Sequence, residues 1–234
     1  MSIRFEQKAK SGIPAYIKPE TAELWQSQKK YIESQNSINN WVYKIQWPDF
    51  LNEKKIETPE KLGGWHERAV IKDAPNSIKI DMPVIWVKKE NLRDIMLFFK
   101  EDTSFSYNVL TDLTAVDLLN SPDSEDIKNN QDKRFQVRYI LRSLKNKGAL
   151  IRIIVSVSDE EEVPSLCDVW VGANWPEREV YDLMGIKFSN HPNLKRILMP
   201  DNYKGHPLRK DFPLKGLGED YLIEDLLKEH SLSD

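Results

Sequence analysis

The stretch RFQVRYILRSLKNKGALIRIIVSV, residues 134–157, decides the fold of this chain. Its first half alternates apolar and polar side chains, which is the period of a half-buried strand. The apolar positions are Phe135, Val137, Tyr139 and Leu141. Residues 145–148, Lys-Asn-Lys-Gly, have the composition of a tight turn, and the apolar run 149–157 follows at once. The stretch therefore predicts two strands joined as a hairpin.

Upstream of the hairpin, the pattern predicts a strand, a helix and another strand. Residues 78–87 are an apolar run bent at Pro83, and residues 88–101 carry apolar side chains at helical spacing. Those helical positions are Leu92, Ile95, Met96 and Phe99. Residues 106–119 are β-branched and apolar, as in a strand. Together these elements predict an α+β fold, a mixed α/β two-layer arrangement with a mostly antiparallel sheet and helices on one face.

The first 75 residues carry weaker signals, and we expect an N-terminal extension there. Residues 19–35 begin with a proline and continue with helix-forming residues, although the apolar stripe is thin. Residues 39–47 alternate like a strand and lead into a connection rich in Pro, Gly and Lys. The core domain is therefore expected to span residues 76–186.

Two helices are expected downstream of the hairpin. Pro164 is expected to open a short one. A second begins near Trp175, and Gly185 followed by an apolar residue is a typical C-terminal stop. On the second helix, the apolar stripe leaves Trp175, Arg178 and Asp182 on the opposite side. A tryptophan beside an Arg–Asp pair is typical of a protein-contact patch, so we expect these three side chains to face outward.

Prolines shape the remainder of the chain. Those at positions 192, 200, 207 and 213 exclude a long helix and remove hydrogen-bond donors from any central strand. The same segment holds more apolar side chains than a disordered linker needs, and six Lys or Arg lie between His191 and Lys215 against two Asp. We predict an extended partner-binding segment over residues 187–216 and an acidic tail over residues 217–234.

The composition limits the classes of function. The formal net charge of the 234 residues is −3, without the basic excess of a dedicated nucleic-acid binder. Cys167 is the single cysteine, so the chain cannot hold an iron–sulfur cluster with four thiolates of its own. The most apolar run, residues 149–157, is too short to cross a membrane. We expect any membrane attachment to occur through partners.

Acidic and imidazole side chains gather late in the chain and could be combined into a metal-dependent hydrolase site. The candidates are Glu177, Glu179, Asp182, His191 and His206. Their spacing matches no metal-ligand motif, and an arginine such as Arg196 or Arg209 is a sufficient partner for the carboxylates. We therefore expect no catalytic, cofactor-binding or metal-binding residue in the chain, and we expect Cys167 to be a buried structural thiol.

Residues 173–214 resemble the signature of the C-type subunit of respiratory complex I, the proton-pumping NADH:quinone oxidoreductase. The shared pattern has Glu-Arg-Glu at 177–179, then Asp182 and Gly185, then His-Pro at 191–192, and finally Gly-His-Pro-Leu-Arg-Lys-Asp at 205–211. The resemblance extends over roughly residues 78–216. Asn190 stands where glycine is usual before His-Pro, and asparagine tolerates the left-handed backbone that the glycine would supply.

This resemblance implies a subunit of the hydrophilic arm without a redox centre of its own. FMN, iron–sulfur clusters and quinone would belong to partner chains, and the subunit would support electron transfer from NADH to quinone coupled to proton translocation. Its partners would be the quinone-site subunit, which is the D-type subunit of complex I, and the adjacent subunit with the terminal cluster. The complex would lie on the cytoplasmic side of the inner membrane, with this chain peripheral.

The resemblance also assigns the charged residues of the motif to a partner interface. The residues expected there are Trp175, Glu177, Arg178, Glu179, Asp182, His191, Arg196, His206, Arg209, Lys210 and Asp211. Two alternatives stay open at this point. One is the equivalent subunit of a membrane-bound hydrogenase, which shares the motif, and the other is a stand-alone metal-dependent hydrolase.

Overall fold

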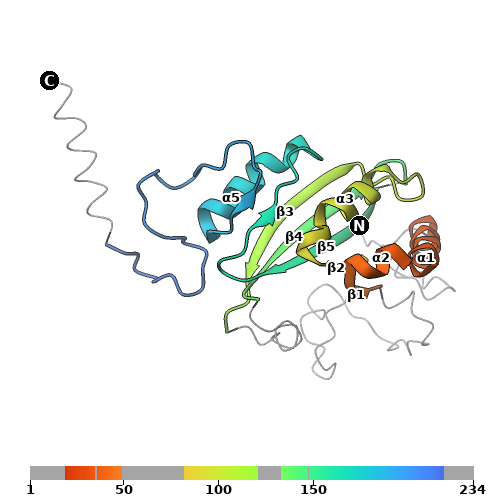
Figure 1. Cartoon of the computed structure of the whole chain (residues 1–234), viewed down its shortest axis with the longest axis horizontal. Helices are drawn as coiled ribbons and strands as arrows, with labels where there is room; N and C mark the ends of the chain where they lie inside the picture. Colours follow the sequence, from red (N-terminus) through yellow and green to blue (C-terminus); the bar gives the residue numbers. More distant parts are fainter. Residues whose placement is uncertain (1–18, 35, 49–81, 121–132, 147, 219–234) are drawn as a thin grey trace, which may run out of the picture.

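The computed structural model of the chain describes residues 19–34, 36–48, 82–120, 133–146 and 148–218 (Figure 1). The domain boundary predicted at residue 75 lies outside the described residues, and so does the acidic tail from residue 219 onward.

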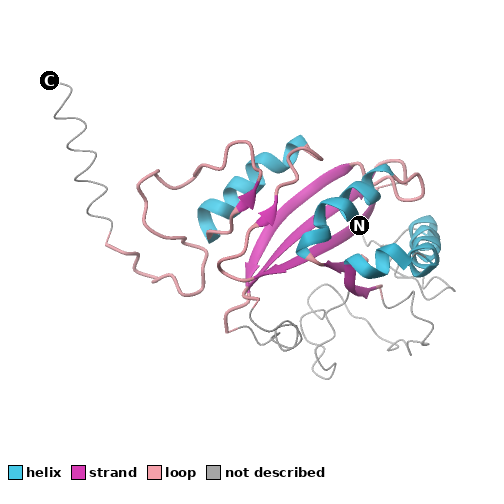
Figure 2. Cartoon of the chain, viewed as in Figure 1, coloured by secondary structure: helices cyan, strands magenta, loops and turns pink. Residues whose placement is uncertain are grey.

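A five-stranded sheet forms the centre of the described chain (Figure 2). In spatial order its strands are β1 (Val42–Gln46), β2 (Val84–Val87), β5 (Ala149–Val157), β4 (Phe135–Ser143) and β3 (Val109–Asp117). Neighbouring strands are antiparallel except β2 and β5, which are parallel. The predicted hairpin is the β4–β5 pair, and the mostly antiparallel α+β fold is confirmed.

The register of the sheet places one side chain from each strand in a single row. The paired positions, in order across the sheet, are Ile45, Ile85, Ile153, Tyr139 and Leu113. All except Ile45 are buried, and the four apolar positions predicted for β4 are fully buried. Since side chains alternate along a strand, this row fixes which face of the sheet is covered.

The described helices pack on that covered face. In α3 (Leu92–Glu101), which follows the 3-10 turn η3 (Lys89–Asn91), the four predicted apolar positions are fully buried. Trp25 and Ile32 of α1 (Pro19–Ser34) and Val180 of α5 (Asn174–Met184) belong to the same apolar cluster. The prediction of helices on one face of the sheet is therefore confirmed.

The N-terminal segment is integrated into this core. Gln28 of α1 donates a hydrogen bond to the carbonyl of Ser104 and accepts one from the hydroxyl of Tyr107. Residues 39–41, expected in a strand, belong instead to the helix α2 (Asn36–Trp41), and the strand β1 begins directly after it. The strand predicted from the alternation of apolar residues is therefore confirmed for residues 42–46 only.

The helix expected to open at Pro164 is not formed. Pro164 lies in a short strand, β6 (Val163–Pro164), which pairs in parallel with β7 (Phe188–Ser189). A turn over residues 167–169 and the 3-10 turn η4 (Val171–Ala173) then lead into α5. The proline supplied a helix-start signal, but pairing with β7 determined the local structure.

Two leucines provide a matched test of this core. Leu92 is fully buried and Leu144 is 62% exposed. We predict that Leu92→Ala lowers the free energy of unfolding by about 2–5 kcal/mol, because it removes buried apolar contacts and leaves a cavity. Leu144→Ala is expected to change it by less than about 0.5 kcal/mol. Urea unfolding followed by tryptophan fluorescence measures both, and equal losses would contradict the described packing.

Candidate functional site

Helix α5 and the segment that follows it bring most of the predicted interface residues together. The helix spans Asn174–Met184 and ends at Gly185, whose φ of 76° is left-handed, as expected of a glycine stop. Asn190 has φ 62°, which confirms the turn expected before His191. We call residues 190–218 the strap, since Figure 1 shows this segment curving around the end of α5.

Asp182 is the centre of the contact between α5 and the strap. Its Oδ2 atom accepts hydrogen bonds from three successive backbone amides of the strap, those of Ile197, Leu198 and Met199, at 3.0, 2.7 and 2.9 Å. Its Oδ1 atom lies 2.6 Å from the guanidinium of Arg196. The side chain is fully buried, so the outward orientation predicted for Asp182 is wrong.

Hydrogen bonding decides the protonation of this carboxyl. Burial alone would raise the pKa of Asp182, but the amides of Met199, Leu198 and Ile197, together with Arg196, hold the pKa below its ordinary value. The carboxylate is therefore charged at neutral pH and fully satisfied by its neighbours. Arg196 was expected from the sequence as a sufficient partner for it, and the structure confirms this pair.

The strap also caps the C-terminal end of α5. A helix leaves its last four carbonyl groups without partners inside the helix. Here the carbonyl of Asp182 accepts from Arg196 and His206, that of Leu183 accepts from the Leu208 amide, and that of Met184 accepts from Arg209. Two guanidinium groups at the negative end of the helix dipole add a favourable electrostatic term.

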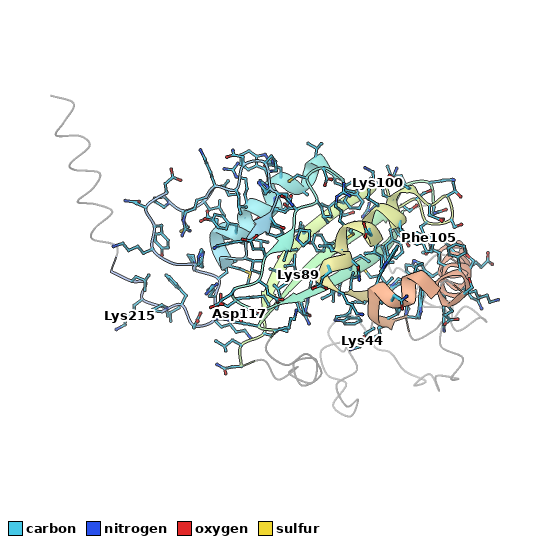
Figure 3. All side chains as sticks on the ribbon, in the orientation of Figure 1. Lys44, Lys89, Lys100, Phe105, Asp117 and Lys215 are labelled. Carbon is cyan, nitrogen blue, oxygen red and sulfur yellow. The ribbon has the colours of Figure 1, made fainter. Side chains whose placement is uncertain are left out.

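A second anchor joins the strap to the sheet. Arg134, just before β4, forms two-pronged contacts with Asp117 at the end of β3 and with Asp211 of the strap. Asp117 is buried and also accepts a hydrogen bond from the Lys210 amide at 2.9 Å. Figure 3 labels Asp117 at the end of the sheet where the strap passes. Arg209 of the strap pairs in the same region with Asp159.

Sequence reasoning missed Asp117, Arg134 and Asp159. A usable signal was present, because Asp117 lies near the end of one predicted strand and Arg134 begins the next one. Opposite charges at the adjoining ends of neighbouring strands are expected to pair. The third partner, Asp211, lies far along the chain, and only the path of the strap brings it there.

Glu177 is the second buried acid of the motif. Its carboxylate accepts hydrogen bonds from the Ser165 hydroxyl at 2.6 Å and from the Leu166 amide at 2.7 Å. Burial raises the pKa of Glu177, and these two hydrogen bonds oppose that effect. The side chain is fully buried, so it joins α5 to the loop after β6 and has no free surface of its own.

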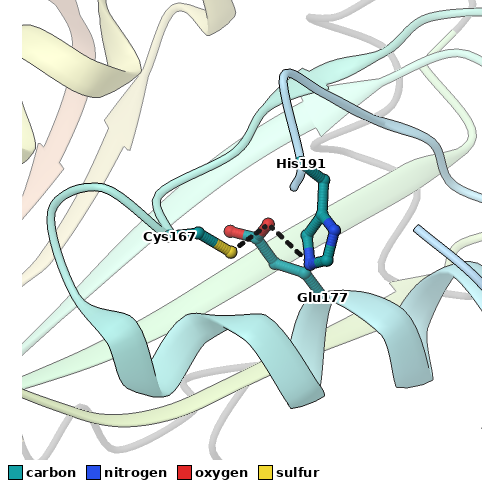
Figure 4. Close-up of side chains that lie close together, drawn as sticks. All are labelled: Cys167, Glu177 and His191. Atoms are coloured by element: carbon teal, nitrogen blue, oxygen red, sulfur yellow. Dashed lines mark hydrogen bonds and ion pairs between the residues drawn. The ribbon is translucent and has the colours of Figure 1, made fainter. Parts of the chain in front are cut away.

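Among the described residues, one group has the composition of a metal site: Cys167, Glu177 and His191 (Figure 4). Their ligand atoms lie within 4.8 Å of one another. His191 Nδ1 accepts a hydrogen bond from the Asn193 amide at 3.0 Å, so the neutral ring carries its proton on Nε2, 3.2 Å from the Asn174 carbonyl oxygen. Nε2 then has no lone pair for a metal ion.

The thiol of this cluster is poorly suited to nucleophilic attack. Burial, with a smaller contribution from the nearby Glu177 carboxylate, raises the pKa of Cys167 to about 11. The thiolate form, which is the nucleophile, is therefore scarce at neutral pH. The geometry favours a hydrogen-bonded junction between the β6 loop, α5 and the start of the strap.

The two histidines of the hydrolase alternative do not share a site. His191 contacts the carbonyl of Asn174 at the start of α5, and His206 contacts that of Asp182 near its end. At 1.5 Å per residue, these contacts lie about 12 Å apart along the helix. Burial, with the charges of Arg196 and Arg209, lowers the pKa of His206. The ring caps a helix carbonyl and is not a candidate metal ligand beside His191.

The remaining predicted interface residues lie at or near the surface. Trp175 is 65% exposed, and the guanidinium of Arg178 lies 5.0 Å from the centre of its ring. Arg178 also donates to the carbonyls of Lys195 and Arg196, so it supports the strap as well as the tryptophan. Glu179, Lys210 and Asp211 are exposed. The outward orientation predicted for Trp175 is confirmed.

Comparison with known proteins gives a consistent group of relatives. Residues 85–217 match the family described as the 30 kDa subunit of respiratory-chain NADH dehydrogenase. The C-type subunit of NADH-quinone oxidoreductase from Geobacter sulfurreducens is 48% identical over 133 residues, which are 56% of this chain and 75% of that protein. The combined C/D-type subunit of the same enzyme from Buchnera aphidicola is 35% identical over 57% of this chain and 22% of that protein.

A solved structure also matches. The trypsin-resistant fragment (1–134) of Nqo5 is 32% identical, with a TM-score of 0.43 over 49% of this chain and 84% of that one. Among the described residues, none of the helices combines the length and apolar character needed to span a membrane.

The sheet, α5 and the strap define a class of protein, a small α+β domain with a C-terminal contact segment. The family match covers more than half of the chain and contains α5 and the strap up to residue 217. The chain belongs to the family of 30 kDa subunits of respiratory-chain NADH dehydrogenase, and it is a subunit of NADH-quinone oxidoreductase.

Gly185 and Gly172 provide a matched test of the helix end. A Cβ atom at Gly185 would lie 2.6 Å from the His206 ring, on a left-handed backbone, whereas one at Gly172 would meet open space. We predict that Gly185→Ala lowers the free energy of unfolding by about 1–3 kcal/mol, because the strained backbone and the displaced ring act together. Gly172→Ala is expected to be nearly neutral in the same urea titration. Equal effects would contradict the packing of His206 on α5.

Acid is expected to release the strap. The pKa values of Asp182, Asp117 and Asp211 lie below their ordinary values in the folded chain. The stability that these three carboxylates add to the folded chain is therefore fully present above their unfolded pKa of about 3.9. It is lost as pH falls through their lower pKa values in the folded chain. Carboxyl ¹³C NMR titration measures this directly. A pKa of Asp182 at or above the ordinary value would contradict the hydrogen-bonded arrangement.

Proposed function

We propose that this chain docks on the quinone-site subunit of NADH-quinone oxidoreductase through the outer surface of the strap. The observation that carries the proposal is the division of the strap into two sides. Its backbone amides and arginines bind the chain's own domain, while Leu198 and Leu208 are each 57% exposed and Leu214 is fully exposed. Three exposed leucines on one short segment favour a protein-contact surface.

The quinone-site subunit, the D-type subunit of the enzyme, is the favoured partner because of the C/D-type relatives. In the Buchnera protein, the region similar to this chain is one part of a longer polypeptide named for both the C-type and the D-type subunits. Covalent fusion requires the two parts to tolerate close association, and a docking segment at the end of the C-type part fits that arrangement. The exposed lysines of the strap, Lys195, Lys210 and Lys215, suit an acidic surround on the partner.

The proposed contribution of the chain to the enzyme is positional. We assign FMN, the iron–sulfur clusters and the quinone to partner subunits, and we propose that this chain holds the quinone-site subunit in register with the adjacent terminal-cluster subunit. The complex would place the chain peripherally on the cytoplasmic side of the inner membrane. The buried residues around Glu177 support this positional role, since their polar groups already form hydrogen bonds within the chain.

The interface residues divide into two groups under this proposal. Trp175, Glu179 and Lys210 are exposed and would touch the partner. Asp182 and Glu177 are fully buried and would act by shaping the surface from beneath. This division predicts that substitutions of the two groups fail in different ways, the first in docking alone and the second in docking and stability together.

The docking surface is tested by charge insertion at exposed leucines. We predict that the double variant Leu198→Asp with Leu208→Asp reduces co-purification with the quinone-site subunit by about tenfold or more, because it places carboxylates in an apolar contact. Leu144→Asp is the matched control, since Leu144 is 62% exposed but lies at the β4–β5 turn. Unchanged urea midpoints would show that all variants fold. Wild-type recovery of the quinone-site subunit by the double variant would refute this docking surface.

A further inference from the structure

The first anchor of the strap is built from backbone groups. Three successive amides, at Ile197, Leu198 and Met199, converge on one oxygen of Asp182. Convergent amides of this kind form a concave anion-binding site, known as a nest. Here the anion is supplied by the chain's own helix, and Arg196 neutralises its other oxygen at 2.6 Å. The backbone conformation of residues 196–199 is therefore fixed without any partner protein.

The middle of the strap has packing of its own. Arg196 also donates to the carbonyls of Tyr203 and Gly205, each at 3.0 Å. The rings of Tyr203 and Phe212 lie 6.4 Å apart, and a Cβ atom at Gly205, where φ is 118°, would meet the Phe212 ring at 2.9 Å. These contacts fold residues 196–212 of the strap into a loop that is held at each end by one of the two anchors.

The second anchor fixes the far end of this loop. The Lys210 amide and the Asp211 carboxylate bind Asp117 and Arg134, which belong to the sheet and its edge. With both ends and the middle held, Leu198 and Leu208 have fixed positions relative to each other. The backbone amide of Leu198 is bound by Asp182, and that of Leu208 is bound by the carbonyl of Leu183.

We propose that the strap is already in its docking conformation in the free chain, with Asp182 and Asp117 as the positioning residues of the docking surface. This inference rests on the proposed function, because it takes the strap as the surface that meets the quinone-site subunit. The partner surface that fits the strap has preformed apolar pockets for the leucines, and carboxylates around these pockets for the lysines. Binding then requires little ordering of the strap, in contrast to segments that fold as they bind.

A positioning role has a quantitative consequence. When only a fraction of the molecules holds the binding-competent conformation, the apparent affinity falls by that fraction. Asp182→Asn keeps the size of the side chain but removes its charge and turns an amide group toward the strap donors. We expect this variant to bind the quinone-site subunit about tenfold more weakly, with the loss mainly in the association rate.

The experiment combines amide hydrogen exchange by NMR on the free full-length chain with surface plasmon resonance against the purified quinone-site subunit. In the wild type, the amides of residues 197–199 are expected to exchange at least about tenfold more slowly than in the unfolded chain. Asp182→Asn should abolish this protection and slow association. Asp94→Asn makes the same chemical change at an exposed carboxylate of α3, outside the proposed docking surface. It is the matched control and should change neither measurement.

Each outcome has a defined meaning. Unprotected amides in the wild-type chain would overturn the inference, and so would a loss of protection in Asp182→Asn without any change in association. If Asp182→Asn does not fold, Asp117→Asn replaces it, with the Lys210 amide as the protected group. A wild-type chain that fails to bind the quinone-site subunit would overturn the proposed function, while the exchange data would still decide whether the strap is preformed.

Discussion

The buried carboxylate of Asp182 is the interaction on which the rest of the site depends. Removing one partner of a buried, hydrogen-bonded ion pair typically costs about 3–5 kcal/mol, because a charge is left without compensation. Here the compensation consists of strap amides and Arg196, so the helix end and the strap stabilise each other. A helix without the strap would lose the groups that cover and bind its carboxylate, and a strap without the helix would lose the anion that organises its amides.

Much of the fold was predictable because its signals are local. The alternation in β4, the helical spacing in α3 and the glycine stop of α5 each depend on a few neighbouring residues, and each was found where expected. The Pro164 helix failed because its environment is not local. That residue pairs with β7, which follows more than twenty positions later, and tertiary pairing outweighed the helix-start preference of proline.

The candidate site was predictable in composition but only partly in geometry. Periodicity placed Asp182 on the polar side of α5, and a polar side is usually a solvated one. The strap instead covers that side, and backbone amides, which no pattern of side chains reveals, satisfy the carboxylate. Trp175 differs because the strap leaves it 65% exposed, so its predicted exposure was correct.

The position of β1 has a consequence for shortened forms of the chain. The family match begins at residue 85, inside β2, and β1 lies before it. Without residues 42–46, β2 would become an edge strand whose four residues are all apolar and buried in the intact chain. Unprotected edges of this kind template pairing with other chains and lead to aggregation. Residues 42–46, which lie outside the matched range, thus cover the edge of β2 and prevent β2 from pairing with a strand of another molecule.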